Sequence, residues 1–226
     1  GRSAQTLLQL VQQHRGLSAA ALGARTLIPQ RQAKQREVET MLATLQAQLS
    51  NDPRLNDLQG TLRADWNHLA QGLNAGQWTV RESYDLHTAL CLTLVELIER
   101  IADVSGLSLD SQADRYHLMR AAFIALPSAT EALGEVRAKG ASVLAVQAMN
   151  ETDRILMYEL LSRVATTQQE LLEAVDKAMA ADPGLKPQLT PLLATAVDHA
   201  HQAERLARQE VTTATRLRYP VVDYLA

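Results

Sequence analysis

The chain has 226 residues, enough to bury a substantial core, and its 46% apolar and 21% charged residues are ordinary for a globular protein. Leu and Ala dominate over aromatic residues, which make up 4%, and 7 prolines and 10 glycines are too few for a turn-rich all-β fold. The net charge is −3 with scattered basic residues, so there is no basic stripe and we expect no nucleic-acid partner.

Apolar residues recur at helical spacing along nearly the whole chain. The first predicted helix covers residues 3–28, and a second, 30–49, follows the interruption at Pro29. The residues Ser-Asn-Asp-Pro at 50–53 indicate the end of one helix and the start of the next, which is predicted over residues 53–73. Pro53 suits its first turn, because the N–H groups there have no partner within the helix.

The middle of the chain carries a clear helix start. Thr79 and Glu82 have the spacing of a capping box, and the helix that they begin ends near Gly106. A further helix is predicted from about residue 111 to residue 140 or beyond, with Pro127 expected to kink or break it.

Two long helices, at about 151–181 and 186–218, complete the chain and are separated by the break at 182–184. Helices approaching thirty residues are about 45 Å long. Joined by short turns, they predict an all-α fold, an elongated up-and-down bundle forming one domain over residues 1–226.

No apolar run is long enough to cross a membrane, and there is no signal peptide. The chain starts at Gly1 without an initiator Met, and we interpret it as a domain cut from a longer protein.

No signature of an enzyme or a metal site is present. His199 and His201 point to different faces of one helix, and there is no phosphate-binding loop or nucleophile–base set. Cys91 stands in an apolar run and is predicted to be a buried core residue. We therefore expect no catalysis, no metal and no cofactor.

One unusual feature is a glycine inside the first helix. Gly16 costs about 1 kcal/mol relative to Ala, which suggests close approach of a neighbouring helix or a ligand. Gln12, Arg15 and Ser18 can present donors on one helical face, and arginine forms forked hydrogen bonds to planar anions. The alternative is a packing glycine beside a solvated arginine.

Two other segments are candidates for the same kind of site. Arg115 and Tyr116 follow the corner at Asp110 and can share a face, although a structural corner between helices is equally consistent. Arg137 lies within the small-residue segment 134–140, where helices could approach closely or a helix could end.

The first-helix pattern Gln12-x-x-Arg15-Gly16-x-Ser18 resembles the N-terminal signature of nitrate- and nitrite-sensing domains. Residues 105–126 look like a segment common in helical sensor regions of methyl-accepting chemotaxis proteins. With the segment around Arg137, the resemblance covers roughly residues 5–145.

This resemblance implies two stacked helical bundles that share long helices, as membrane-distal and membrane-proximal parts. It also implies that one arginine from the first helix and one from a central helix hold the anion, positions best matched by Arg15 and Arg137. His14 replaces a commonly acidic residue, and extra basic residues replace others in the chemoreceptor-like segment. Those changes are expected to favour a more charged ligand, such as a di- or tricarboxylate, over nitrate.

The resemblance therefore predicts a periplasmic sensor domain of a chemoreceptor or related receptor, anchored by flanking membrane spans and working as a homodimer. A small anion would bind between helices and displace one of them. The alternative is a helical adaptor that binds a protein partner and no small molecule. The candidate ligand-binding residues are Arg15, Gln12, Ser18, Arg137, Arg115 and Tyr116.

Overall fold

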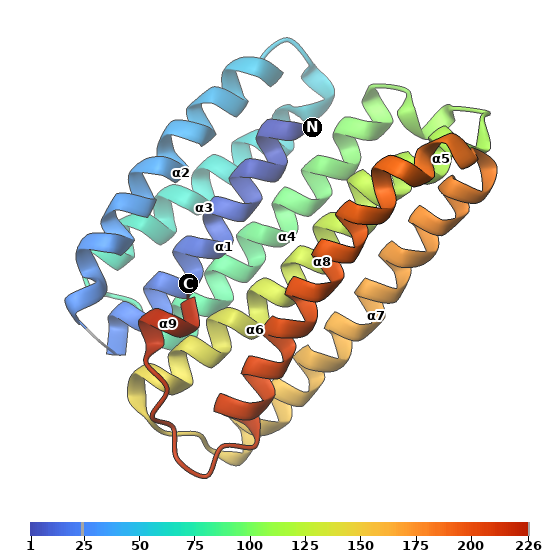
Figure 1. Ribbon diagram of the computed structural model, residues 1–226. Coiled ribbons are helices and arrows are strands. Elements are labelled where there is room, and N and C mark those ends of the chain that lie inside the picture. The colour runs from blue at the N-terminus through green and yellow to red at the C-terminus, as the bar shows by residue number, and fades with distance from the viewer. Residues whose placement is uncertain (24, 226) are drawn as a thin grey trace.

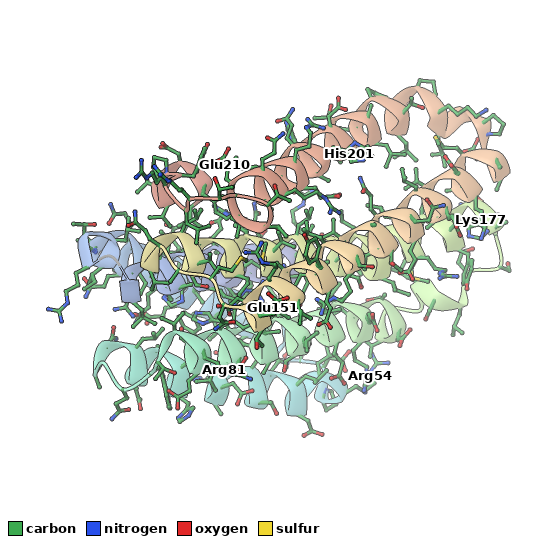
Figure 2. All side chains as sticks on the ribbon, turned by 90° about the horizontal axis from the view of Figure 1, so that it is seen from below. Arg54, Arg81, Glu151, Lys177, His201 and Glu210 are labelled. Atoms are coloured by element: carbon green, nitrogen blue, oxygen red, sulfur yellow. The ribbon has the colours of Figure 1, made fainter. Side chains whose placement is uncertain are left out.

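The structure is a computed structural model that describes residues 1–23 and 25–225, and throughout these residues the regular structure is helical. The α-helices are α1 (Arg2–Gly23), α2 (Ile28–Leu49), α3 (Asn56–Asn74), α4 (Val80–Val104), α5 (Ala113–Arg120), α6 (Leu126–Val146), α7 (Glu151–Ala181), α8 (Lys186–Ala207) and α9 (Val221–Leu225). They form an up-and-down bundle (Figure 1), which confirms the predicted fold class. Charged side chains such as Arg81 and Lys177 lie at its outer surface (Figure 2).

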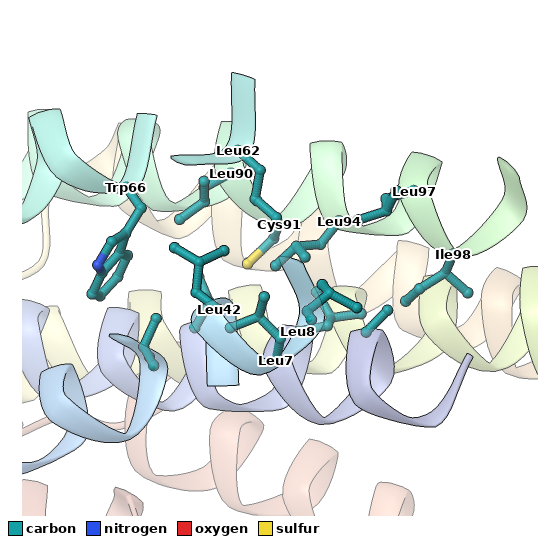
Figure 3. Packing of buried hydrophobic residues seen from close by; sticks show 14 of the residues in the cluster. Leu7, Leu8, Leu42, Leu62, Trp66, Leu90, Cys91, Leu94, Leu97 and Ile98 are labelled. Carbon is teal, nitrogen blue, oxygen red and sulfur yellow. The ribbon is translucent and has the colours of Figure 1, made fainter. Parts of the chain in front are cut away.

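The described residues form three hydrophobic clusters, and α1 contributes to the two larger ones. The N-terminal half of α1 packs with α2, α3 and α4, where Leu7, Leu42 and Cys91 are buried (Figure 3). Cys91 is 0% exposed, as predicted for a core residue. The C-terminal half of α1 packs with α6, α7 and α9 around residues such as Val136 and Leu160. The two bundles lie side by side, and α1 joins them (Figure 1).

Three local sequence signals for helix ends are confirmed. Thr79 and Glu82 form the capping box at the start of α4, and Gly106 leaves α4 with a φ of 72°, which favours glycine. Pro29 lies at the second residue of α2, after a 3₁₀ turn over Arg25–Leu27, so it starts a helix as expected.

Pro127 neither breaks nor sharply ends the helical path. A π-helical turn over Ala121–Ala125 joins α5 to α6, and its backbone bonds reach back five residues. In this register the missing N–H of Pro127 would have served the Ala122 carbonyl. That oxygen instead accepts a 2.7 Å hydrogen bond from Gln5 Nε2 of α1. The irregularity predicted at Pro127 therefore includes a π-helical turn directly before it, and the freed acceptor is satisfied from α1.

The last predicted helix ends earlier than expected. Regular α-helix stops at Ala207, a π turn covers Arg208–Thr212, and the chain is not helical again until α9. Thr212 and Thr213 bond their side-chain hydroxyls to backbone carbonyls five residues earlier, which competes with continued helix. Pro220 then disfavours helical geometry in the residue before it. The helix prediction over residues 208–218 was wrong beyond that turn.

Candidate functional site

The arginine of the first-helix motif is fully buried and already holds a carboxylate. Arg15 Nη1 lies 2.6 Å from Glu131 Oε1 on α6, and Nη2 lies 3.3 Å from Oε2. Nη1 also donates to Thr88 Oγ1 on α4 at 3.0 Å, while Gln12 Nε2 donates to Glu131 Oε2 at 3.0 Å. Arg15 is therefore neither solvated nor free, because α6 supplies its counter-ion.

Two glycines allow these elements to approach. A Cβ atom on Gly134 of α6 would lie 2.8 Å from Arg15 Nη2, and one on Gly16 would lie 3.0 Å from Leu225 Cδ2 of α9. The close approach predicted at Gly16 is thus made by a neighbouring helix, α9. Similarly, Gly140 leaves space for Tyr224, whose hydroxyl oxygen would lie 2.1 Å from an added Cβ.

A second buried carboxylate extends the polar network by one helical turn. Glu135 accepts a 3.1 Å hydrogen bond from the Tyr84 hydroxyl and pairs with Arg163 of α7. Burial raises the pKa of Glu131, and the attraction of Arg15 opposes that shift. The network links α1, α4, α6 and α7 across the seam between the two bundles.

Beside Arg15, two buried histidines form a chain of hydrogen bonds. His87 Nδ1 lies 2.6 Å from the Ser83 carbonyl oxygen, which can only accept, so this nitrogen carries the proton. His87 Nε2 then accepts from His14 Nδ1 at 2.8 Å. Burial lowers the pKa of both rings, to about 3 for His87, so both are neutral at physiological pH.

Ser18 is also buried next to this seam. Its hydroxyl has no hydrogen-bond partner within residues 1–23 and 25–225, and the same holds for His14 Nε2. Ser18 lies one helical turn beyond Arg15 and outside the cavity described next.

A cavity of about 850 Å³ separates α8 from α1 and α6. Its polar wall includes Arg137 of α6, Gln12 of α1 and Gln202 of α8. The other polar lining residues are Arg2, Gln5, Thr6, Gln9, Gln13, Thr130, His199, Asp223 and Tyr224. Among the residues of α8, Ala200 and Ala207 alone are buried, so this helix stands off from the bundle across the cavity.

Arg137 lies on the wall of the cavity and is anchored at one nitrogen. Its Nη2 donates to the backbone carbonyl of Leu225, at the end of α9. A guanidinium has five N–H donors in a planar fork, so others remain for a bound group. Arg2 adds a second positive charge to the wall and Asp223 adds one negative charge.

The structure brings together part of the predicted residue set. Gln12, Arg15 and Arg137 lie along the α1–α6 seam, but Gln12 and Arg137 alone of these three reach the cavity. Arg115 and Tyr116 lie on α5, where Arg115 is 3.7 Å from Asp110. Arg115 precedes Arg137 by 22 residues of nearly continuous helix, or roughly 33 Å. The structure therefore does not bring Arg115 and Tyr116 into this site.

Sequence reasoning missed Glu131, Glu135 and Thr88. The sequence did contain a signal for the two glutamates, which lie four residues apart on an apolar, small-residue face of α6. A carboxylate buried on such a face needs a hydrogen-bonding or charged partner. Nothing local indicated that Arg15 would be that partner.

The part of the chain that is described contains no group of three or more His, Cys, Asp or Glu side chains arranged to hold a metal ion. In the same residues, none of the helices combines the length and apolar character needed to cross a membrane.

A helical bundle with a large cavity, lined by both polar and apolar side chains beside a buried arginine network, has the features of a ligand-binding domain. The family model for nitrate and nitrite sensing matches residues 6–222, and the chain therefore belongs to that family. This confirms the resemblance of the first-helix motif, and the family is a sensing rather than a catalytic one. No curated protein and no solved structure matches the chain.

Proposed function

We propose that the chain is the periplasmic sensor domain of a bacterial chemoreceptor or related transmembrane receptor, that it is not an enzyme, and that it binds a small anion between α1, α6 and α8. The observation that carries this proposal is the cavity of about 850 Å³ with Arg137 and Gln12 on its wall. Membership of a nitrate- and nitrite-sensing family supports an anion as the ligand.

The chemistry of the wall suits an oxyanion. Arg137 offers a planar fork of donors, and side-chain amides such as Gln12 and Gln202 add neutral donors and acceptors around it. Nitrate, nitrite and carboxylates all present oxygens that such a set can bind.

Arg15 has a different part in this proposal. Its hydrogen bonds to Glu131 would have to break before an external anion could replace that carboxylate. Arg15 instead fixes Glu131, which holds the Gln12 amide at the cavity wall. Arg15 is thus a positioning residue that ties α1 to α6.

The cavity also gives a route for signalling. Because α8 buries few side chains, a ligand that contacts α1, α6 and α8 together would favour conformations in which α8 lies closer to α6. Such a displacement would pass along α8 and α1 into flanking membrane spans, and in a homodimer it would change how the two copies pack.

Calorimetry and thermal unfolding with nitrate, nitrite and acetate test the proposal. A ligand at about 100 times its Kd stabilises the folded state by about 2.7 kcal/mol. For a chain of this size that raises the melting temperature by about 5–11 °C. Arg137→Met should lose this shift, whereas Arg81→Met, an exposed change on the side of the molecule opposite α8 (Figure 2), should keep it.

Equal binding by Arg137→Met and the unmodified chain would refute the assigned site. If no anion binds at all, the adaptor alternative gains, with the exposed side chains of α8, such as Leu192, as the surface for a partner helix. Membrane-spanning segments on both sides of this domain in the full-length protein would separate the two hypotheses further.

A further inference from the structure

The cavity is much larger than an inorganic anion needs. Its volume of about 850 Å³ falls in the range of about 300–1,000 Å³ that is typical of pockets for drug-sized organic molecules. Nitrate bound at Arg137 would leave most of this space to water. The size of the cavity therefore points to a ligand with a body as well as a charged group.

A second, smaller hollow of about 130 Å³ lies between α6, α7 and α8. Its wall is chiefly apolar, with Leu171, Leu193 and Val197 among its residues. It also contains Gln168, whose buried amide nitrogen has no partner in the described part of the chain. This hollow suits the apolar part of a molecule, with one hydrogen-bond donor at its edge.

The two hollows share one wall. Leu126, Thr130 and Leu133, on successive turns of α6, line both of them. Leu126 is 39% exposed although it faces α8, because the space between these two helices is not filled by side chains. From Arg137 the distance along the α6 axis is roughly 6 Å to Leu133 and roughly 16 Å to Leu126. Polar and apolar binding surfaces are therefore adjacent along one helix.

We propose that the ligand is an amphipathic organic monoanion, a carboxylate with an aliphatic or aromatic body. Its carboxylate would bind at Arg137 and Gln12, and its apolar body would pass over the ridge of Leu126, Thr130 and Leu133 into the smaller hollow. This inference rests on the proposed anion-binding function and names its ligand class. Such a ligand would also account for the space between α8 and α6, because its apolar body would complete the packing of these two helices.

Calorimetry with acetate, octanoate and octan-1-ol tests this directly. Octanoate should bind at least tenfold tighter than acetate, because its chain leaves water, and tighter than octanol, which lacks the charge. Ala196→Trp should remove the advantage of octanoate over acetate, because Ala196 is exposed and lines the smaller hollow, so a larger side chain fills it without entering a core. Ala194→Trp, an exposed change on the same helix that lines neither hollow, should leave it unchanged.

The outcomes separate this inference from the function on which it rests. If acetate or nitrate binds and octanoate binds no tighter, the ligand class is wrong and the anion site stands. If octanol binds as tightly as octanoate, the apolar body alone is recognised and the amphipathic anion is refuted. If none of the anions binds, the proposed function fails as well. Unchanged octanoate binding by Ala196→Trp, with circular dichroism showing a folded protein, would refute the assigned path.

Discussion

Breaking the Arg15–Glu131 ion pair should destabilise the protein strongly. Both side chains are almost completely buried, at 0% and 4% exposed, with a shortest separation of 2.6 Å. Removing one partner of such a pair leaves an uncompensated buried charge, at a cost of about 3–5 kcal/mol. Arg15→Met or Glu131→Leu alone should therefore lower the melting temperature by about 6–20 °C in a chain of this size.

The double variant Arg15→Met/Glu131→Leu should recover most of that loss. Replacing both charges by apolar side chains of similar volume removes two buried ions together and is often neutral or stabilising by about 1–4 kcal/mol. Chemical denaturation of the four proteins in a double-mutant cycle measures the coupling, and circular dichroism checks that all four fold. Single variants that each cost less than about 1 kcal/mol, and that add without coupling, would refute the buried ion pair.

The same four proteins test the role assigned to Arg15. If Arg15 positions Glu131 and Gln12, the double variant should still bind the anion, with affinity reduced because the Gln12 amide has lost its carboxylate partner. If binding is abolished while stability is restored, Arg15 contacts the ligand directly and the positioning role is wrong.

Two further predictions concern the close packing at Gly140 and the protonation of the buried His87. Gly140→Ala should lower the free energy of unfolding, measured by urea denaturation, by about 1–3 kcal/mol, because its Cβ would meet the Tyr224 hydroxyl. The control Gly60→Ala, with no atom within 4 Å of its added Cβ, should be neutral or stabilising. Equal effects of the two substitutions would contradict the close contact at Gly140. Since the pKa of His87 is lowered to about 3 in the folded state, its contribution to stability is complete above the unfolded pKa of 6.5 and is lost as pH falls toward 3. Between pH 7.5 and 5 the free energy of unfolding should fall by about 2 kcal/mol. His87→Gln should reduce this loss, and the exposed control His201→Gln should not. Identical pH profiles for the unmodified protein and the two variants would refute the neutral burial of His87.

Local signals in the sequence were enough for most of the helices. The capping box at Thr79, the restart at Pro29 and the glycine after α4 each act within one helical turn, so neighbouring residues determine them. The apolar run around Cys91 also identified a core residue correctly. The first-helix motif pointed to the sensing family because it depends on residue types at fixed short spacings.

The end of the chain shows where local reasoning failed. Apolar spacing continues beyond Ala207, but α9 turns back to place Tyr224 against Gly140 and Leu225 against Gly16. Those contacts join segments more than eighty residues apart on the chain, as the hydrogen bond of Tyr224 to Val136 illustrates. Helical periodicity describes one segment and carries no information about such a return.

The arginines of the candidate site also show the difference between what neighbouring residues predict and what long-range packing determines. Local residue spacing is enough to place the motif arginine on a helix beside a glycine. It does not predict that Arg15 meets Glu131, 116 positions away, or that Arg137 faces the cavity while Arg115 lies far from it. A buried charge must be compensated by whichever group packing brings to it, and packing depends on long-range contacts between helices.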